Sequence, residues 1–258
     1  MKKFVTALGA ASLSALSLLF SSASAEAANL TLRSDLLTEF SKFVPSEGIP
    51  LDEQTLPKLD SSQLFWEQGV SDVEVYFINE AARFKNQLFF SANDGPMNEI
   101  FNNISSTQSI VSEDSGVLTL GEGRTLGSFD GPTQLSFFLK ADGFNGGQKV
   151  YGADEYTGSI VDGQEINRDG LSHLIAYSYF DEIEQQEYTI LGFEDLRGPF
   201  GQGSDRDFND AVFAIRGIVA DAETTEATSE PSTLLSLVSL LGLTAIAKQR
   251  SLKKSLNA

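Results

Sequence analysis

The chain has no cysteine and only one histidine among its 258 residues. The absence of cysteine excludes disulfides, thiol nucleophiles, iron–sulfur clusters and zinc sites with cysteine ligands. Because His173 is the single histidine, a histidine-rich metal site is excluded, and any hydrolase with a histidine base would depend on that residue. The fold must therefore stand on its hydrophobic core, for which 41% hydrophobic residues, with 19 Phe, are sufficient.

Basic residues are also scarce, with 18 Lys and Arg against 36 Asp and Glu. Six of the basic residues lie in the two terminal segments, before residue 26 and after residue 247. The chain between them carries 12 basic and all 36 acidic side chains, a net charge of −24. This charge excludes nucleic acid as a partner of the central region, because a phosphate backbone would be repelled, whereas a polyvalent cation would be attracted.

The N-terminus has the three parts of a secretory signal peptide. Met1-Lys2-Lys3 is basic, residues 4–20 are apolar, and Ala23-Ser24-Ala25 is a small-residue cleavage site. We therefore predict that residues 1–25 form a signal peptide, with Ala27 as the alternative point of cleavage. The other interpretation, an uncleaved anchor, requires a longer apolar run. The protein is predicted to be exported.

The C-terminus has the pattern of a second targeting segment. An acidic linker, 220–230, precedes a single apolar transmembrane helix predicted at 232–247 and a basic tail at 248–258. With Glu230-Pro231-Ser232, residues 231–258 resemble the PEP-CTERM sorting signal of Gram-negative bacteria, although Ser229 replaces the first proline of the motif. The resemblance implies a transient inner-membrane anchor, removal by a membrane protease, and delivery to the cell surface, outer membrane or extracellular matrix.

The region between these two terminal segments is typical of an all-β protein. Eleven of the 22 glycines fall between Gly121 and Gly170, which disfavours long helices. We predict a β-sandwich or jelly-roll-like domain over residues 61–219. Residues 29–60, with helical periodicity at 35–43, are predicted to form a peripheral arm on it. The expected strands, separated by turn sequences such as Asn145-Gly146-Gly147, lie at 73–78, 87–91, 117–120, 133–140, 171–179, 188–193 and 211–219.

Acidic residues concentrate at one predicted hairpin. If 188–193 and 211–219 pair, the loop end between them gathers five carboxylates and one amide, from Glu194, Asp195, Asp205, Asp207, Asn209 and Asp210. Like charges brought together in this way repel one another, so a compensating cation is expected. Hard oxygen ligands in this number suit Ca²⁺, which takes 6–8 oxygens.

The spacing of Asp205, Asp207 and Asn209 matches the first half of an EF-hand loop. The second half does not match, because Asp210 occupies the position of the required glycine and Arg216 that of the bidentate glutamate. The EF-hand is therefore excluded, and a shorter calcium loop remains as a hypothesis. The alternative is that these residues only form turns and cap backbone groups.

The same stretch resembles the signature of the domain-of-unknown-function 4114 family. The resemblance rests on residues 192–196, a glycine-rich gap, and residues 205–210 before an apolar strand. Upstream, 75–80, 137–140 and 167–177 are similar to bacterial proteins that pair this domain with a PEP-CTERM tail, so the resemblance covers most of 62–217. It implies a secreted β-rich domain without an established catalytic role.

We therefore predict a non-enzymatic, calcium-binding surface domain with a role in adhesion or in the extracellular matrix, where exopolysaccharide or surface components are its partners. One alternative is a carbohydrate-binding module, for which Trp66 beside Phe65 could provide a stacking platform if they are not core residues. Another is a glycoside hydrolase with paired carboxylates such as Glu194 and Asp207. His173 is expected to be a satisfied structural residue, or otherwise to support the acidic site.

Overall fold

The computed structural model describes residues 30–44, 46–51, 56–67, 71–112 and 116–222. Almost every element in these ranges is a strand, as the all-β prediction requires. The elements are β1 (Leu30–Thr31), α1 (Ser34–Ser41), β2 (Lys58–Trp66), β3 (Val73–Asn79), β4 (Asn86–Ala92), β5 (Asn98–Ile104), β6 (Glu122–Gly127), β7 (Thr133–Ala141), η1 (Gly143–Asn145), β8 (Lys149–Tyr151), η2 (Asp154–Tyr156), β9 (Ile160–Val161), β10 (Gln164–Glu165), β11 (Leu174–Asp181), β12 (Gln186–Phe193), β13 (Ala211–Arg216) and β14 (Val219–Ala222).

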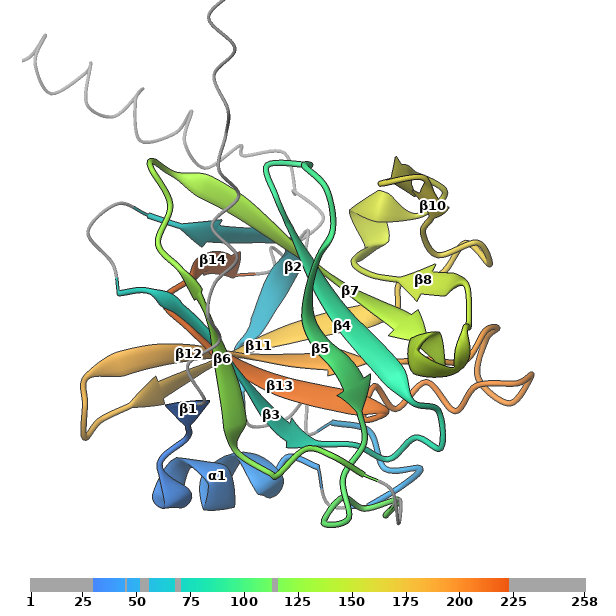
Figure 1. Ribbon diagram of the computed structural model, residues 1–258. Helices are drawn as coiled ribbons and strands as arrows, with labels where there is room; N and C mark the ends of the chain where they lie inside the picture. Colours follow the sequence, from blue (N-terminus) through green and yellow to red (C-terminus); the bar gives the residue numbers. More distant parts are fainter. Residues whose placement is uncertain (1–29, 45, 52–55, 68–70, 113–115, 223–258) are drawn as a thin grey trace, which may run out of the picture.

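The strands form one antiparallel sheet in the order β1-β6-β3-β13-β12-β11-β2-β7-β4-β5, with β8 added to β7 and β14 to β2. Strand β2 is the point where the sheet turns. Its first residues, Lys58 and Leu59, pair with β11, whereas its last two, Phe65 and Trp66, pair with β7. The sheet therefore curls instead of continuing flat (Figure 1). Only β9 and β10 form a separate two-stranded ribbon among the described residues.

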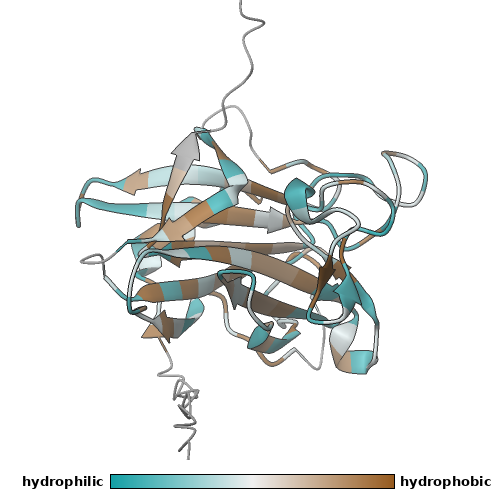
Figure 2. Ribbon diagram, turned by 90° about the horizontal axis from the view of Figure 1, so that it is seen from above, coloured by the Kyte–Doolittle hydropathy of each residue, from teal (hydrophilic) through white to brown (hydrophobic). Residues whose placement is uncertain are grey.

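The inside of the curl holds the main hydrophobic core. Phe101 on β5 stacks on Phe213 of β13 at 5.9 Å between ring centroids, although the two strands lie far apart in the strand order. Phe77 and Phe193 also contact Phe213. Hydrophobic residues concentrate on the central strands, and many of the turns at the strand ends are hydrophilic (Figure 2). Each buried aromatic side chain contributes about 1.5–3 kcal/mol, so this cluster provides much of the stability.

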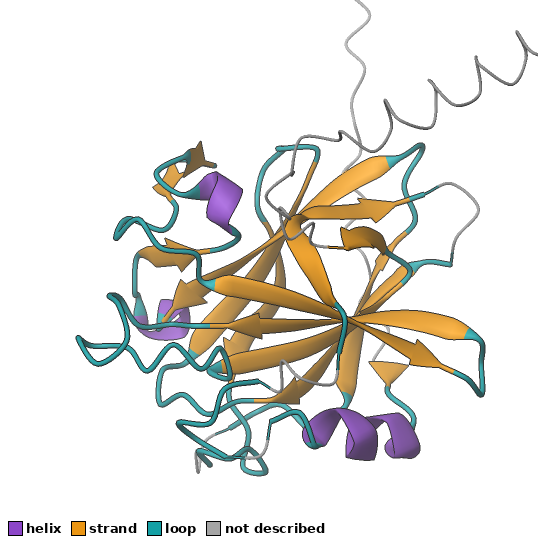
Figure 3. Cartoon of the chain, turned by 180° about the vertical axis from the view of Figure 1, so that it is seen from behind, coloured by secondary structure: helices purple, strands orange, loops and turns teal. Residues whose placement is uncertain are grey.

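A second core lies on the outer face of the same strands, under α1 (Figure 3). Leu36 and Phe40 of α1 are buried, and Phe40 packs edge-on against Tyr179 of β11 at 5.0 Å. Strand β13 consequently has both faces covered, with Phe213 in the inner core and Val212 in the outer one. This explains its nearly unbroken apolar sequence, because a strand buried on both faces does not alternate.

Three predicted strands need correction. Residues 117–120 are not a strand, because the amides of Val117 and Leu118 both donate to the carbonyl of Ser105; the strand follows at β6. The predicted strand at 171–179 begins at Leu174. The predicted run 211–219 is interrupted at Gly217, whose φ of +86° ends β13 before β14 begins. The sequence predicted no strand at the positions of β1, β2, β5, β8, β9 and β10.

The predicted targeting segments at the two termini lie outside the described residues. These are the signal peptide at 1–25, the linker beyond residue 222, and the sorting segment at 231–258 with its helix at 232–247. Within the described ranges, no helix is both long enough and apolar enough to cross a membrane.

Candidate metal centre

The acidic residues flank the ends of two paired strands. Strands β12 and β13 pair antiparallel, with Phe193 opposite Ala211 as the last pair. Glu194 and Asp195 therefore leave the sheet where Asn209 and Asp210 enter it. The loop between them, residues 196–208, returns Asp205 and Asp207 to the same end, so the predicted hairpin forms and its register brings the acidic segments together.

Three of the six predicted ligands form a compact cluster. Glu194, Asp205 and Asp207 each offer a carboxylate oxygen, and these oxygens lie within 4.8 Å of one another. The side chains of Glu194 and Asp207 are buried, with 0% and 1% exposure, whereas Asp205 is half-buried. Carboxylates this close and this poorly solvated are costly unless protons or a cation compensate them.

The backbone of the loop is unusual at alternate residues. Arg206 and Phe208 have φ values of +55° and +58°, a left-handed conformation that non-glycine residues seldom adopt. Asp207 lies between them, and its Oδ1 accepts the amide of Asn209. Each of these two residues pays a conformational free-energy cost for its positive φ. Such a cost is tolerated only where surrounding contacts hold the loop in place.

The other two carboxylates, Asp195 and Asp210, form a pair beside this cluster. The amide of Asp195 donates to Asp210 Oδ2 at 2.7 Å, and Asn86 Nδ2 donates to Asp195 Oδ2 at 2.7 Å. The pair borders a hollow of about 290 Å³ that Glu47 and Arg83 also line. The structure therefore divides the predicted ligand set into a three-carboxylate cluster and an adjoining pair.

The electrostatics of the corner follow from this crowding. Burial raises the pKa of Glu194 and of Asp207, and the charge on Asp205 adds to both effects. Burial, followed by repulsion from neighbouring carboxylates, also raises the pKa of Asp195 and Asp210. Two buried oxygens, Glu194 Oε2 and Asn209 Oδ1, have no hydrogen-bond partner among the residues that the structure describes. An oxygen-seeking cation would satisfy both needs, the excess charge and the unpaired acceptors.

The N-terminal arm also contributes to the corner, a contribution not expected from the sequence. The amide of Gly48 donates to Asp207 Oδ2 at 2.9 Å, and that of Leu51 donates to the carbonyl of Asp207 at 3.0 Å. Asn209 Nδ2 in turn donates to the carbonyls of Ser46 and Ile49. No sequence signal could have indicated these contacts, because they join segments about 160 residues apart through backbone groups.

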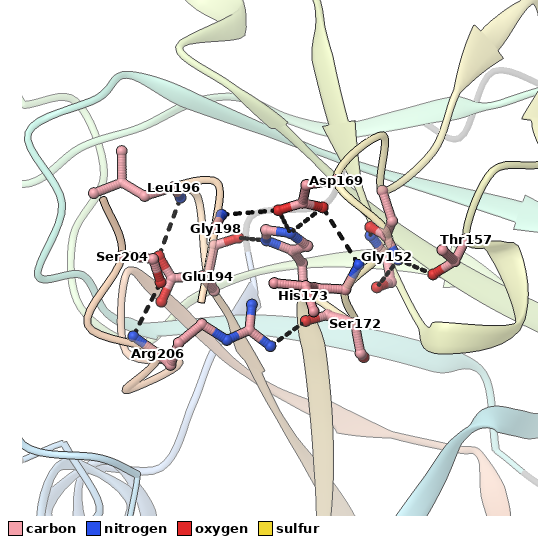
Figure 4. A network of polar contacts seen from close by, with 12 residues as sticks. Gly152, Thr157, Asp169, Ser172, His173, Glu194, Leu196, Gly198, Ser204 and Arg206 are labelled. Atoms are coloured by element: carbon pink, nitrogen blue, oxygen red, sulfur yellow. Dashed lines mark hydrogen bonds and ion pairs between the residues drawn. The ribbon is translucent and has the colours of Figure 1, made fainter. Parts of the chain in front are cut away.

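The opposite side of the loop is held by a network around His173 (Figure 4). His173 Nδ1 donates to the carbonyl of Glu194, and Nε2 lies 3.1 Å from both carboxylate oxygens of Asp169. Asp169 also accepts the amide of Gly198 at 2.9 Å, and Arg206 donates to the carbonyl of Ser172. The histidine is fully buried and satisfied, and it supports the acidic corner through backbone contacts.

Of the predicted stacking platform, Trp66 is buried and Phe65 is half-buried. Trp66 is 3% exposed, donates its indole N–H to the carbonyl of Ser71, and packs against Phe129, so it is a core residue. The large aromatic side chains that are exposed in the described ranges, Phe144, Phe180 and Phe200, lie on η1, β11 and the 196–208 loop. They do not form a row on one face of the sheet.

Residues 129–218 match the model of a family described as Domain of unknown function (DUF4114). The match covers β7 to β13 with the whole acidic corner, about a third of the chain, and it supports the predicted resemblance over this part. No curated protein and no solved structure matches the chain.

Proposed function

We propose that this chain is an exported, non-enzymatic β domain that binds Ca²⁺ at the β12–β13 corner. The observation that carries the proposal is the cluster of Glu194, Asp205 and Asp207, with carboxylate oxygens within 4.8 Å of one another and two side chains almost fully buried. The unpaired oxygens of Glu194 and Asn209 add to it. Oxygen-only ligands favour Ca²⁺ over softer metals.

Burial argues against the glycoside hydrolase. The two carboxylates that it would use belong to Glu194 and Asp207, which are 0% and 1% exposed. A polysaccharide substrate could not reach carboxylates that are buried to this extent. A carbohydrate-binding module of the stacking type is likewise not favoured, because Trp66 is in the core. We also infer that the curled sheet is of the sandwich or jelly-roll type, since Phe101 and Phe213 meet across it.

The biological setting is inferred from the sequence. A signal peptide at 1–25 and a sorting signal at 231–258 support delivery to the surface or matrix of a Gram-negative bacterium, after removal of the 232–247 anchor by a membrane protease. There the domain would act in adhesion or matrix organisation, with exopolysaccharide or surface components as partners. Millimolar calcium outside the cell would keep such a site filled.

Melting curves with calcium, magnesium or chelator test the metal site. A cation that binds only the folded protein adds about 2.7 kcal/mol at a hundredfold excess over Kd. For a domain of this size we expect calcium to raise the melting temperature by roughly 5–11 °C. Magnesium should do less, because its octahedral shell accepts an all-protein cage poorly.

The matched variants are Asp207→Asn in the cluster and Asp130→Asn on an exposed turn. We expect Asp207→Asn to remove most of the calcium shift, because it takes one charge from the buried cluster, and Asp130→Asn to retain it. An equal shift in both variants, or no shift in the wild type at millimolar calcium, would contradict the metal site. The acidic residues would then only form turns and cap backbone groups.

A further inference from the structure

The segment Ser46–Leu51 of the arm is fastened to the loop that carries Asp205 and Asp207. Four hydrogen bonds join the two, and all of them involve Asp207 or Asn209. One of them, from the Gly48 amide, goes to Oδ2 of Asp207, an atom of the proposed ligand side chain. The position of this carboxylate and that of the arm are therefore linked.

Glu47 lies inside this fastened segment. Its neighbours Ser46 and Gly48 are both hydrogen-bonded to the corner, and its side chain lines the hollow that Asp195 and Asp210 border. Burial, followed by repulsion from Asp207, Asp205 and Glu194, raises the pKa of Glu47. Glu47 is itself exposed, and its carboxylate is not one of the three whose oxygens lie within 4.8 Å of one another, so it lies beside the cluster and not in it.

The corner also contains buried oxygen atoms that could coordinate a cation. Glu194 Oε2 and Asn209 Oδ1 are buried acceptors without a partner in the described structure, and both residues are 0% exposed. With one oxygen from each carboxylate, the cluster supplies three of the 6–8 oxygens that Ca²⁺ takes. A further carboxylate from outside the 194–210 segment would bring the site closer to that number.

We propose that Glu47 is a ligand of the same cation, so that calcium fastens the N-terminal arm to the β12–β13 corner. The inference rests on the proposed calcium site. Because the arm also carries α1, whose Leu36 and Phe40 cover the outer face of the sheet, the cation would stabilise that outer layer as well as the loop.

Calcium titration by calorimetry of the wild type and three variants tests the ligand. Glu47→Gln removes the charge, Glu47→Asp keeps it but shortens its reach, and Glu39→Gln removes a carboxylate from the helix of the same arm. We expect calcium affinity to fall about tenfold or more in both Glu47 variants. Glu39→Gln should bind as the wild type does.

Hydrogen exchange provides a second measurement. The amides of Gly48 and Leu51 donate to Asp207, so their exchange should slow on adding calcium, by up to about 100-fold at a hundredfold excess over Kd. The amide of Asn145, which belongs to η1, is the reference and should not change. In Glu47→Gln this protection should largely disappear.

The outcomes separate the two proposals. If the wild type binds calcium with Asp207-dependent affinity but Glu47→Gln binds equally well and the arm amides do not change, Glu47 is not a ligand and only this inference is overturned. If Glu47→Asp binds like the wild type while Glu47→Gln is weak, Glu47 acts through charge alone, which also overturns it. If the wild type does not bind calcium, both proposals are wrong.

Discussion

Gly192 lies on β12 directly behind the acidic loop, and its lack of a side chain allows the loop to approach. A Cβ atom at this position would lie 2.5 Å from the carbonyl oxygen of Phe208, which is well inside van der Waals contact. Gly192→Ala must therefore push the loop outward. We expect it to lower the free energy of unfolding by about 1–3 kcal/mol, measured by urea denaturation.

Gly131→Ala is the matched control, because a Cβ there meets nothing within 4 Å and the residue has no left-handed φ. It should leave the unfolding midpoint nearly unchanged. Gly192→Ala should also weaken the calcium-dependent shift, since Phe208 adjoins Asp207 and Asn209. If Gly192→Ala unfolded at the same urea concentration as Gly131→Ala, the close packing of loop on strand would be contradicted.

At the scale of elements, the arm is joined to the β11–β12 hairpin by an ion pair. Arg33 Nη1 lies 2.8 Å from Asp181 Oδ2, and the arginine also contacts Asp35 and Glu184. The hydrogen bond from Arg33 lowers the pKa of Asp181. A pKa lowered by folding contributes stability above the unfolded value of about 3.9 and loses it as the pH falls through the native value.

The Asp181→Asn variant should therefore melt at a lower temperature than the wild type at pH 7, and the difference should close as the pH falls below about 4. Melting curves of both proteins between pH 7 and pH 2.5 measure this. The comparison cancels the titration of the acidic corner, which both proteins share. A difference that grows on acidification would have the wrong sign for this ion pair.

The strands that could be predicted are those with two features, β-branched or aromatic residues and a clear turn beyond. Strands β3, β7 and β12 satisfy both and were predicted within a residue or two at each end. Strand β5, Asn98–Ile104, contains three asparagines, which are poor strand formers, and lies at the edge of the sheet. Its position comes from pairing with β4, which the local sequence does not encode.

In the candidate site, too, only the features encoded in the local sequence could be predicted. The hairpin register followed from two apolar strands and a glycine-rich loop, so the meeting of Glu194 with Asp207 could be predicted from nearby sequence. The contacts of Gly48 and Leu51 with Asp207 could not, because they depend on how the arm packs on the finished sheet. Nor could the placement of Asp169, which reaches the loop through Gly198. Long-range backbone contacts of this kind carry no local pattern.

At the scale of the molecule, the acidic charge and the predicted targeting segments are consistent with the same environment, the outside of the cell. The region between the termini carries a net charge of −24, which would destabilise a compact fold through self-repulsion unless cations offset part of it. Part of that charge is gathered at one buried corner. A domain built in this way suits a calcium-rich exterior better than a compartment where calcium is scarce.

Maturation should change the ends of the chain without disturbing the fold. Cleavage after Ala25 or Ala27 would leave β1 intact, because its pairing with β6 starts at Leu30 opposite Gly123. Removal of everything after about Glu230 would likewise spare β14, which ends at Ala222. We therefore expect native protein to begin at Glu26 or Ala28 and to end near Glu230, as measured by intact mass. Its calcium-dependent melting should match that of the unprocessed chain. Recovery of a stable inner-membrane form that ends in Ala258 would instead favour a simple membrane anchor over the sorting signal.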